Sequence, residues 1–269
     1  MTIEQTTAVH GRETRYLEAG TGRPIVLLHA FPFSADMWRA QLGRVPKGWR
    51  FIAPDLRGFG SGTVAPDPSR ASMDDFAADT LALLDTLSIE RVVIAGLSMG
   101  GYVTFALFRQ APARFTGLVL ADTKAQADTP DGKAGRRAMS ELLRTKGVGA
   151  VVDGLLPKLA GETTRRARPA VMAEARRLME ANRPAAIDAA LHALMNRPDS
   201  TPELGRITCP ALVIVGQEDT VTPVADAELL ARSIGGAELA VLPGAGHLSN
   251  LEVPEDFSNV LAAFLSRSF

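Results

Sequence analysis

Cysteine is nearly absent from this sequence, which has one, Cys209, among 269 residues. A single cysteine excludes an internal disulfide, and its place at the mouth of an apolar stretch favours a buried, unreactive thiol. Long apolar runs are missing too. None approaches the ~20 residues of a membrane-spanning helix, and the first residues lack the basic and apolar regions of a secretion signal. We therefore expect a cytoplasmic protein that does not associate with a membrane.

The sequence also lacks an excess of charge of either sign. Its 29 Lys and Arg residues balance 30 Asp and Glu residues, and both signs are mixed along the chain. A surface that binds nucleic acid would need a basic stripe, so nucleic acid is not an expected partner. The hydrophobic content of 46% is enough for one large domain with a well-buried core.

Apolar runs alternate with helical patterns over most of the chain. Helical spacing predicts helices over residues 72–87, 99–110 and 225–233 and from Pro254 onward, with Ser72 and Asp75 as a capping box. Continuous apolar runs predict strands that are buried on both faces, after an N-terminal hairpin: residues 24–28, 50–54, 91–95, 117–121, 210–215 and 238–242. This alternation predicts an α/β fold with a mostly parallel sheet and helices on both faces.

A further short helix is expected between the first two of these strands. Ser34 is predicted to cap it, and Met37, Trp38 and Leu42 are predicted to point inward.

Residues 123–204 break the alternation of strands and helices. They are rich in Ala, Arg, Leu and Met, they contain no β-branched apolar run, and several stretches show one apolar face. We expect an all-helical lid over the carboxyl edge of the sheet, inserted between core residues 1–122 and 205–269. A separate interaction module is the alternative, but the position between two core strands favours the lid.

The sequence Gly96-Leu-Ser-Met-Gly100 follows one predicted strand directly and precedes a predicted helix. A sharp turn there requires a positive φ at Ser98, and the two glycines remove the side chains that would clash. The Ser98 hydroxyl would then stand clear of the sheet, close to the backbone N–H of Met99 and the positive end of the helix. We predict that Ser98 is a nucleophile.

A serine hydroxyl needs a base to activate it. His247 lies in a glycine-rich loop between the last predicted strand and the last helix, at the sheet edge where α/β proteins bind ligands. His10 is expected to be solvated, and His192 is expected to lie on a lid helix in a core or pocket-lining position. His247 is therefore the predicted base.

The base in turn needs a carboxylate that holds its tautomer. Asp219 directly follows the strand 210–215 and is the predicted partner of His247. Its neighbour Glu218 is expected to face solvent. Asp122, at the end of the preceding strand, is the competitor, although its position also suits a cap for the first lid helix.

An oxyanion formed on attack by Ser98 needs two preorganised donors. The Met99 N–H is one. The loop after strand 24–28 reads His29-Ala-Phe-Pro32, and proline has no N–H. We predict that the Phe31 amide is the second donor and that His29 is a structural residue bonded within the loop.

These features together resemble the α/β-hydrolase superfamily, over the whole chain. The resemblance rests on the elbow at Ser98, on the order Ser98, Asp219, His247, on the loop after an early strand, and on the sequence Asp55-Leu-Arg-Gly-Phe-Gly-Ser-Gly62. The elbow Gly-Leu-Ser-Met-Gly-Gly is similar to that of small serine esterases and lactonases, including arylesterases and 3-oxoadipate enol-lactonases. Serine in the elbow disfavours relatives with an aspartate nucleophile, the epoxide hydrolases and haloalkane dehalogenases.

One residue departs from this family pattern. Ala30 stands where relatives usually have glycine in the loop that begins His-Gly. A methyl group at this position is expected to leave the Phe31 amide available.

The resemblance implies hydrolysis of a carboxylic ester or lactone through an acyl-enzyme on Ser98, with no metal or organic cofactor. The expected partner is a small, largely apolar substrate, because the lid has apolar faces and Phe31, Phe33 and Trp38 are near in sequence. C–C bond hydrolases and perhydrolases or cofactor-free haloperoxidases use similar triads and are alternatives. A ligand-binding sensor with a slow triad is an alternative of another class.

Overall fold

The structure is a computed structural model that describes residues 1–61 and 68–269. Gly62, the last residue of the sequence that begins at Asp55, lies outside the described residues. Within the described ranges, no helix is both long and apolar enough to cross a membrane.

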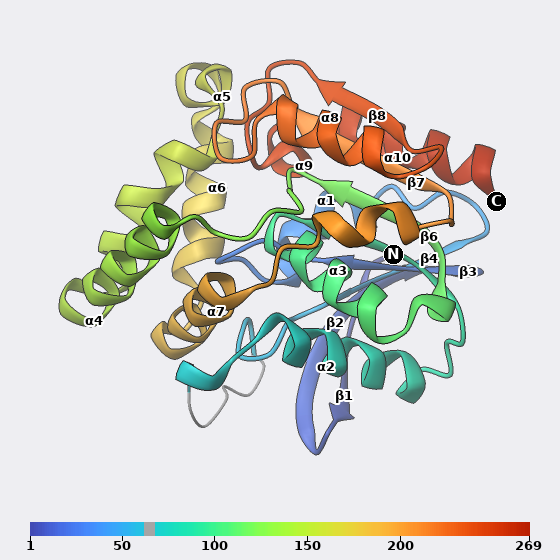
Figure 1. The fold of residues 1–269 in the computed structure, drawn as a ribbon, viewed down its shortest axis with the longest axis horizontal. Coiled ribbons are helices and arrows are strands. Elements are labelled where there is room, and N and C mark those ends of the chain that lie inside the picture. The colour runs from blue at the N-terminus through green and yellow to red at the C-terminus, as the bar shows by residue number, and fades with distance from the viewer. Residues whose placement is uncertain (62–67) are drawn as a thin grey trace.

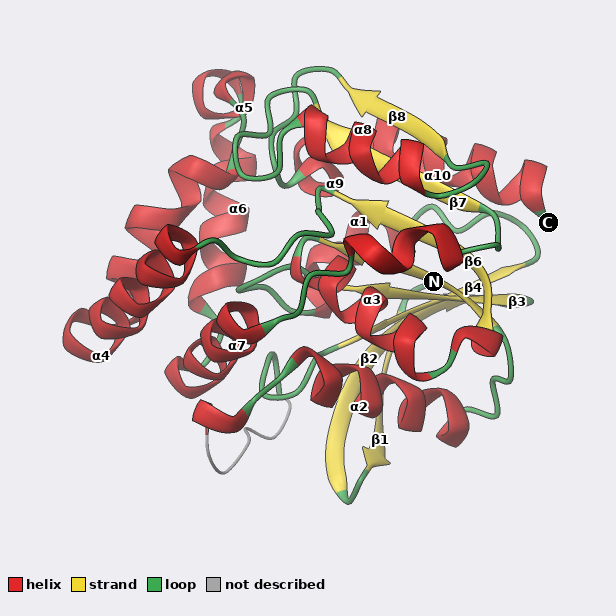
Figure 2. Ribbon diagram, viewed as in Figure 1, coloured by secondary structure: helices red, strands yellow, loops and turns green. Residues whose placement is uncertain are grey.

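The centre of the molecule is an eight-stranded, mostly parallel sheet (Figure 2). Its strand order is β1-β2-β4-β3-β5-β6-β7-β8. The pairs β1–β2 and β2–β4 are antiparallel, and the pairs from β4 to β8 are parallel. Each predicted strand is present, with bounds that differ by a few residues at most: β1 Ile3–Val9, β2 Arg12–Gly20, β3 Arg23–Leu28, β4 Trp49–Pro54, β5 Val92–Leu97, β6 Phe115–Ala121, β7 Ala211–Gly216 and β8 Glu238–Leu242. The predicted fold class is therefore confirmed.

Helices cover both faces of the sheet. Neighbouring residues of one strand point to opposite faces, so they pack against different helices. Val26 and Leu28 of β3 point into the apolar layer that also contains buried residues of α2 (Met73–Thr86), α3 (Met99–Gln110) and α8 (Val224–Ser233). Ile25 and Leu27 pack on the other side with α1 (Arg39–Leu42) and α10 (Pro254–Ser268). Side chains fully covered in this way account for the continuous apolar runs of the parallel strands.

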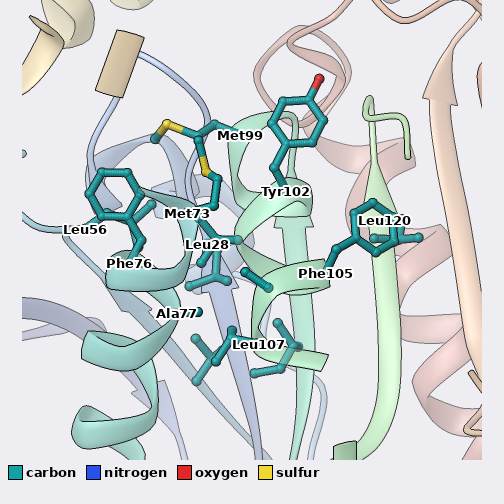
Figure 3. Packing of buried hydrophobic residues seen from close by; sticks show 14 of the residues in the cluster. Leu28, Leu56, Met73, Phe76, Ala77, Met99, Tyr102, Phe105, Leu107 and Leu120 are labelled. Carbon is teal, nitrogen blue, oxygen red and sulfur yellow. The ribbon is translucent and has the colours of Figure 1, made fainter. Parts of the chain in front are cut away.

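The first of these two layers carries the helix that begins at the elbow. Leu28, Phe76 and Met99 lie close together between the sheet, α2 and α3 (Figure 3). All three are at most 1% exposed, so this packing fixes the start of α3 against the end of β3.

The two predicted helix caps have different outcomes. At α2 the capping box forms: the Asp75 amide donates to Ser72 Oγ at 3.1 Å, and the Ser72 amide donates to Asp75 Oδ2 at 3.0 Å. Ser34 does precede the short 3₁₀ helix η1 (Ala35–Trp38), but its side chain makes no capping bond. Its hydroxyl donates to Asp36 Oδ2 instead, at 3.4 Å. The predicted side-chain cap at Ser34 is wrong: the Ala35 amide, at the start of η1, donates to Asp55 Oδ1 at 2.8 Å.

Residues 123–204 form helices and no strand, as predicted. The helices are α4 (Pro130–Leu159), α5 (Glu162–Ala167), α6 (Pro169–Glu180) and α7 (Pro184–Asn196), and the 3₁₀ helix η4 (Thr201–Arg206) leads back to the sheet. Gly147, at φ 79°, interrupts α4. The four helices lie together beyond the carboxyl ends of the strands (Figure 1).

Three short elements complete the described chain. The 3₁₀ helices η2 (Pro68–Arg70) and η3 (Pro112–Arg114) precede α2 and β6, and α9 (Ser249–Glu252) lies directly before α10.

Candidate active site

Ser98 occupies a strained turn between β5 and α3. Its backbone has φ 54° and ψ −110°, outside the regions that side-chain-bearing residues usually adopt. The flanking backbones pass as closely as the sequence predicts. A Cβ on Gly96 would lie 2.3 Å from the carbonyl carbon of Gly100, and a Cβ on Gly100 would lie 2.2 Å from the Leu28 oxygen. Glycine at both positions is therefore required for this turn.

Three predicted residues from three strand ends meet at this turn. His247 Nε2 lies 2.7 Å from Ser98 Oγ, and His247 Nδ1 lies 2.8 Å from Asp219 Oδ2. Because an ionised Asp219 only accepts hydrogen bonds, the proton of a neutral His247 belongs on Nδ1. The lone pair of Nε2 then faces the Ser98 hydroxyl.

The charges at this site are buried. His247 is 2% exposed and Asp219 is 4% exposed. Burial by itself lowers the pKa of His247, but the charge and hydrogen bond of Asp219 outweigh it, and the pKa lies above the usual 6.5. Burial would raise the pKa of Asp219, yet His247 and the hydrogen bonds from Thr222 hold it below its usual value of 3.8.

Thr222 is a member of this site that the sequence analysis missed. Its hydroxyl donates to Asp219 Oδ2 at 2.7 Å and lies 3.1 Å from His247 Nδ1. The amides of Val221 and Thr222 donate to Asp219 Oδ1 at 2.8 and 3.0 Å. An aspartate whose side chain bonds the amides two and three residues later is a recognisable turn pattern, so Asp219-x-x-Thr222 was an available signal.

Asp122 is fully buried, and its carboxylate is hydrogen-bonded to residues other than His247. Its Oδ1 accepts from the Gly216 amide at 2.8 Å, and its Oδ2 accepts from the Ser249 hydroxyl. The helix cap considered for Asp122 is wrong, because Thr129 caps α4 through the Gly132 amide. Burial, reinforced by the nearby Asp219 charge, raises the pKa of Asp122 well above 3.8.

Glu218 does not simply face solvent, and that prediction is wrong. Its carboxylate accepts hydrogen bonds from the backbone N–H and the hydroxyl of Thr163, in the first turn of α5. Its side chain is half-buried. The carboxylate next to Asp219 therefore ties the end of β7 to the helical segment 123–204.

The loop after β3 holds the second predicted amide. Neither the Phe31 N–H nor the Met99 N–H bonds to an acceptor within the described part of the chain, so both are free to donate. Ala30 is fully buried, and its own amide donates to Met37 Sδ at 3.2 Å. With alanine at position 30, the Phe31 amide therefore stays available as a hydrogen-bond donor.

His29 has the structural role that the sequence predicts. Its Nδ1 lies 2.9 Å from the Ala30 oxygen, and its Nε2 accepts from the Leu56 amide at 3.0 Å. Burial lowers its pKa to about 4, so His29 is neutral at physiological pH. It links the loop after β3 to the loop after β4.

The aromatic residues predicted to line a pocket separate into two groups. Phe31 keeps 7% of its surface exposed, whereas Phe33 and Trp38 are fully buried. The Trp38 ring packs 5.8 Å from the ring of Phe257 on α10. Trp38 therefore belongs to the core beneath the sheet.

The remaining polar candidates lie away from this turn. His10 pairs with Asp79 at 3.0 Å near the N-terminal hairpin, and His192 is half-buried on α7. Burial raises the pKa of the Cys209 thiol, as expected of an unreactive cysteine. The described residues hold no group of three or more His, Cys, Asp or Glu side chains suited to a metal ion.

Comparison with known proteins gives one consistent fold family. The family model described as the alpha/beta hydrolase fold matches residues 23–254. The chain is 30% identical to 3-oxoadipate enol-lactonase 2 of Acinetobacter baylyi, over 90% of this chain and 88% of that protein.

Solved structures agree with the sequence comparison. A thermophilic esterase from Thermogutta terrifontis matches with a TM-score of 0.92 and 38% identity, over 100% of this chain and 99% of that one. The enol-lactonase from Burkholderia xenovorans matches with a TM-score of 0.89 and 30% identity, over 97% and 100% of the two chains.

Proposed function

The chain belongs to the α/β-hydrolase family, and from that premise we propose that it cleaves carboxylic esters or lactones through an acyl-enzyme on Ser98. Esterases and enol-lactonases are among the proteins it matches at 30% identity or more, so the chain is an enzyme of the carboxylic ester hydrolase class. The observation that carries the finer proposal is the unbroken line of hydrogen bonds from Asp219 through His247 to Ser98.

In the first half of the reaction, Ser98 Oγ attacks the carbonyl carbon of the substrate while His247 Nε2 takes its proton. Asp219 holds the ring by its Nδ1–H and stabilises the imidazolium that forms. When the tetrahedral intermediate collapses, the bond to the alkoxy oxygen breaks, and His247 returns the proton to the leaving alcohol. In a lactone that alcohol stays attached to the acyl group.

The second half repeats these steps with water as the nucleophile. His247 takes a proton from water, the hydroxide attacks the ester carbon on Ser98, and the carboxylic acid leaves as the proton returns to Ser98. In both halves the negative charge develops on the carbonyl oxygen. The unused amides of Phe31 and Met99 are the proposed donors to it, each worth about 3 to 4 kcal/mol in comparable sites.

We also propose that the helical segment 123–204 acts as the lid of this site and sets its substrate range. It lies beyond the strand ends that carry Ser98, Asp219 and His247 (Figure 1). Leu143, Val151 and Leu194 of its helices are buried in the same apolar cluster as Met99. A small, largely apolar ester or lactone suits such surroundings.

The test is hydrolysis of short-chain aryl esters and of simple lactones by the wild-type protein and by Ser98→Ala. Loss of the nucleophile should lower kcat by roughly 10⁴- to 10⁶-fold. Ser266→Ala, on the exposed side of α10, is the matched control and should keep the wild-type rate. Undiminished turnover by folded Ser98→Ala would refute the proposal. If each wild-type molecule hydrolysed a single substrate molecule slowly and then stopped, the alternative function as a ligand-binding sensor would be favoured.

A further inference from the structure

One buried carboxylate near His247 has no part in the proposed chemistry. Glu252, the last residue of α9, is 3% exposed. Its Oε1 accepts from the Gly246 amide at 3.0 Å and from the Leu248 amide at 3.1 Å. One oxygen therefore holds the backbone on both sides of His247.

The other oxygen of Glu252 reaches into the helical segment 123–204. Its Oε2 accepts from the Gly161 amide at 2.9 Å, between α4 and α5. In return, the His247 amide donates to the Leu159 oxygen at 2.8 Å. Residues 159–161 thus bind the histidine loop directly as well as through Glu252.

The two backbones touch so closely that only glycine fits. A Cβ on Gly246 would lie 2.3 Å from the Gly161 nitrogen, and a Cβ on Gly161 would lie 2.7 Å from the Gly246 nitrogen. Such contact leaves little room for the histidine loop to move independently of residues 159–161.

The same stretch of the helical segment also reaches the loop of the carboxylate. The Thr163 amide donates to Glu218 Oε2 at 2.8 Å, one residue before Asp219. Arg168 Nη1 donates to the Gly244 oxygen at 2.8 Å, on the histidine loop. Thr163, at the start of α5, and Arg168, directly after its end, therefore bridge the loops that carry Asp219 and His247.

Resting on the proposed function, we infer that Glu252 is a positioning residue: it fixes the His247 loop against residues 159–161 and so holds His247 Nε2 within reach of Ser98 Oγ. At residues 159–161 the lid is therefore attached to the core and does not move independently of the His247 loop. Displacement of residues 159–161 would move His247 as well.

The charge of Glu252 has a second effect, on the ionisation of His247. Three carboxylates influence this ring: Asp219 most strongly, then Asp122 and Glu252. All three raise the pKa of His247 against the opposing effect of burial. Removing the negative charge at position 252 should therefore lower that pKa.

The test compares Glu252→Gln and Glu252→Ala with the wild-type protein. Gln keeps the shape but loses one acceptor oxygen and the charge, whereas Ala releases all three amides. Because displacement of a base by about 1 Å costs on the order of 100-fold, we expect kcat to fall about 100-fold in Glu252→Ala and less in Glu252→Gln, with KM little changed. Glu255→Gln is the matched control, since Glu255 is exposed on α10 and pairs with Arg44.

Two readouts separate positioning from a purely structural role. The pH profile of kcat/KM should move its acidic limb to lower pH in both Glu252 variants. NMR titration of His247, one of four histidines, should show the same fall in pKa without any substrate. A purely structural residue would lower the urea midpoint but leave kcat per folded molecule and the His247 titration unchanged.

Folded Glu252→Gln with wild-type kcat and a wild-type His247 titration would overturn the inference. If the variants do not fold, amide exchange in the wild-type protein decides: Gly161, Gly246 and Leu248 should exchange together, and independent exchange would overturn it. Activity retained by Ser98→Ala refutes the proposed function alone, because the titration and exchange measurements do not depend on catalysis.

Discussion

The side-chain amide of Asn182, between α6 and α7, donates to the carbonyl oxygen of Pro32 at 2.9 Å, across 150 residues of sequence. Its Oδ1 accepts from the Gly60 amide at 2.9 Å, and its Nδ2 also donates to the Leu178 oxygen at 3.0 Å. Asn182 is 3% exposed. The loop proposed to supply the Phe31 amide is therefore held in place by the helical segment 123–204.

Asn182→Ala should weaken both stability and catalysis. Buried partners left without a hydrogen bond cost about 1 to 3 kcal/mol each, so the urea midpoint should fall clearly. Because the Pro32 carbonyl loses its anchor beside Phe31, kcat should fall by more than KM changes. The control is Asn196→Ala, at the exposed end of α7, where the side chain donates to the His192 oxygen of the same helix. Equal effects of the two variants on kcat would contradict this role.

The pH profile of the wild-type enzyme should fall on the acidic side. His247 must be neutral to accept a proton, and its pKa lies above 6.5. The value of kcat/KM should therefore decline as the pH falls through the pKa of His247. Asp219→Asn removes the charge that raises this pKa. The acidic limb should move to lower pH while kcat falls on the order of 10⁴-fold. An unmoved limb in Asp219→Asn would show that another group controls it.

The same pair should make stability depend on pH. Because the pKa of His247 is raised in the folded state, protonation of His247 stabilises that state, and the stabilisation is complete below pH 6.5. The stabilisation is lost as the pH rises through the folded-state pKa of His247. The lowered pKa of Asp219 stabilises above 3.8 and is lost as pH falls through the folded-state pKa. Urea unfolding should therefore show a larger advantage of wild type over Asp219→Asn near pH 5 than near pH 9.

Asp122→Asn should behave in the opposite way to Asp219→Asn. The pKa of Asp122 is raised, so its ionisation opposes folding as pH rises above 3.8. A neutral isostere should raise the urea midpoint at pH 7 and lower kcat by less than about 10-fold, because Asp122 bonds Gly216 and Ser249. A loss in kcat as large as that of Asp219→Asn would identify Asp122 as the carboxylate that serves His247.

Two glycine substitutions should have opposite effects on stability. In Gly100→Ala the new Cβ would meet the Leu28 oxygen at 2.2 Å, so α3 must move away from β3, at a cost of about 3 kcal/mol or more. Gly135 is exposed in α4 with nothing within 4 Å of its Cβ position. Gly135→Ala should stabilise by up to about 1 kcal/mol. Urea unfolding measures both, and a tolerated Gly100→Ala would contradict the close approach at the elbow.

Local sequence determined the strands, most helices and the turn at Ser98. Apolar runs need burial on both faces whatever they pack against, and the capping box at Ser72 involves residues three apart. The elbow is equally local, since Gly96 and Gly100 are the neighbours that Ser98 requires. Parallel strands place their carboxyl ends on one edge, so Ser98, Asp219 and His247 were predicted to lie on the same edge.

Tertiary structure decided what local patterns left open. Asp122 and Asp219 end neighbouring strands, and only the packing of the histidine loop brings Asp219 to His247 while Asp122 turns to Ser249. Contacts of the helical segment have no local signature, because the two partners are distant in sequence. Glu252 with Gly161 and Asn182 with Pro32 are such pairs. The sequence alone predicted Ser98 as the nucleophile, whereas the fold of residues 123–204 decided which contacts hold the loops of His247 and Phe31 in place.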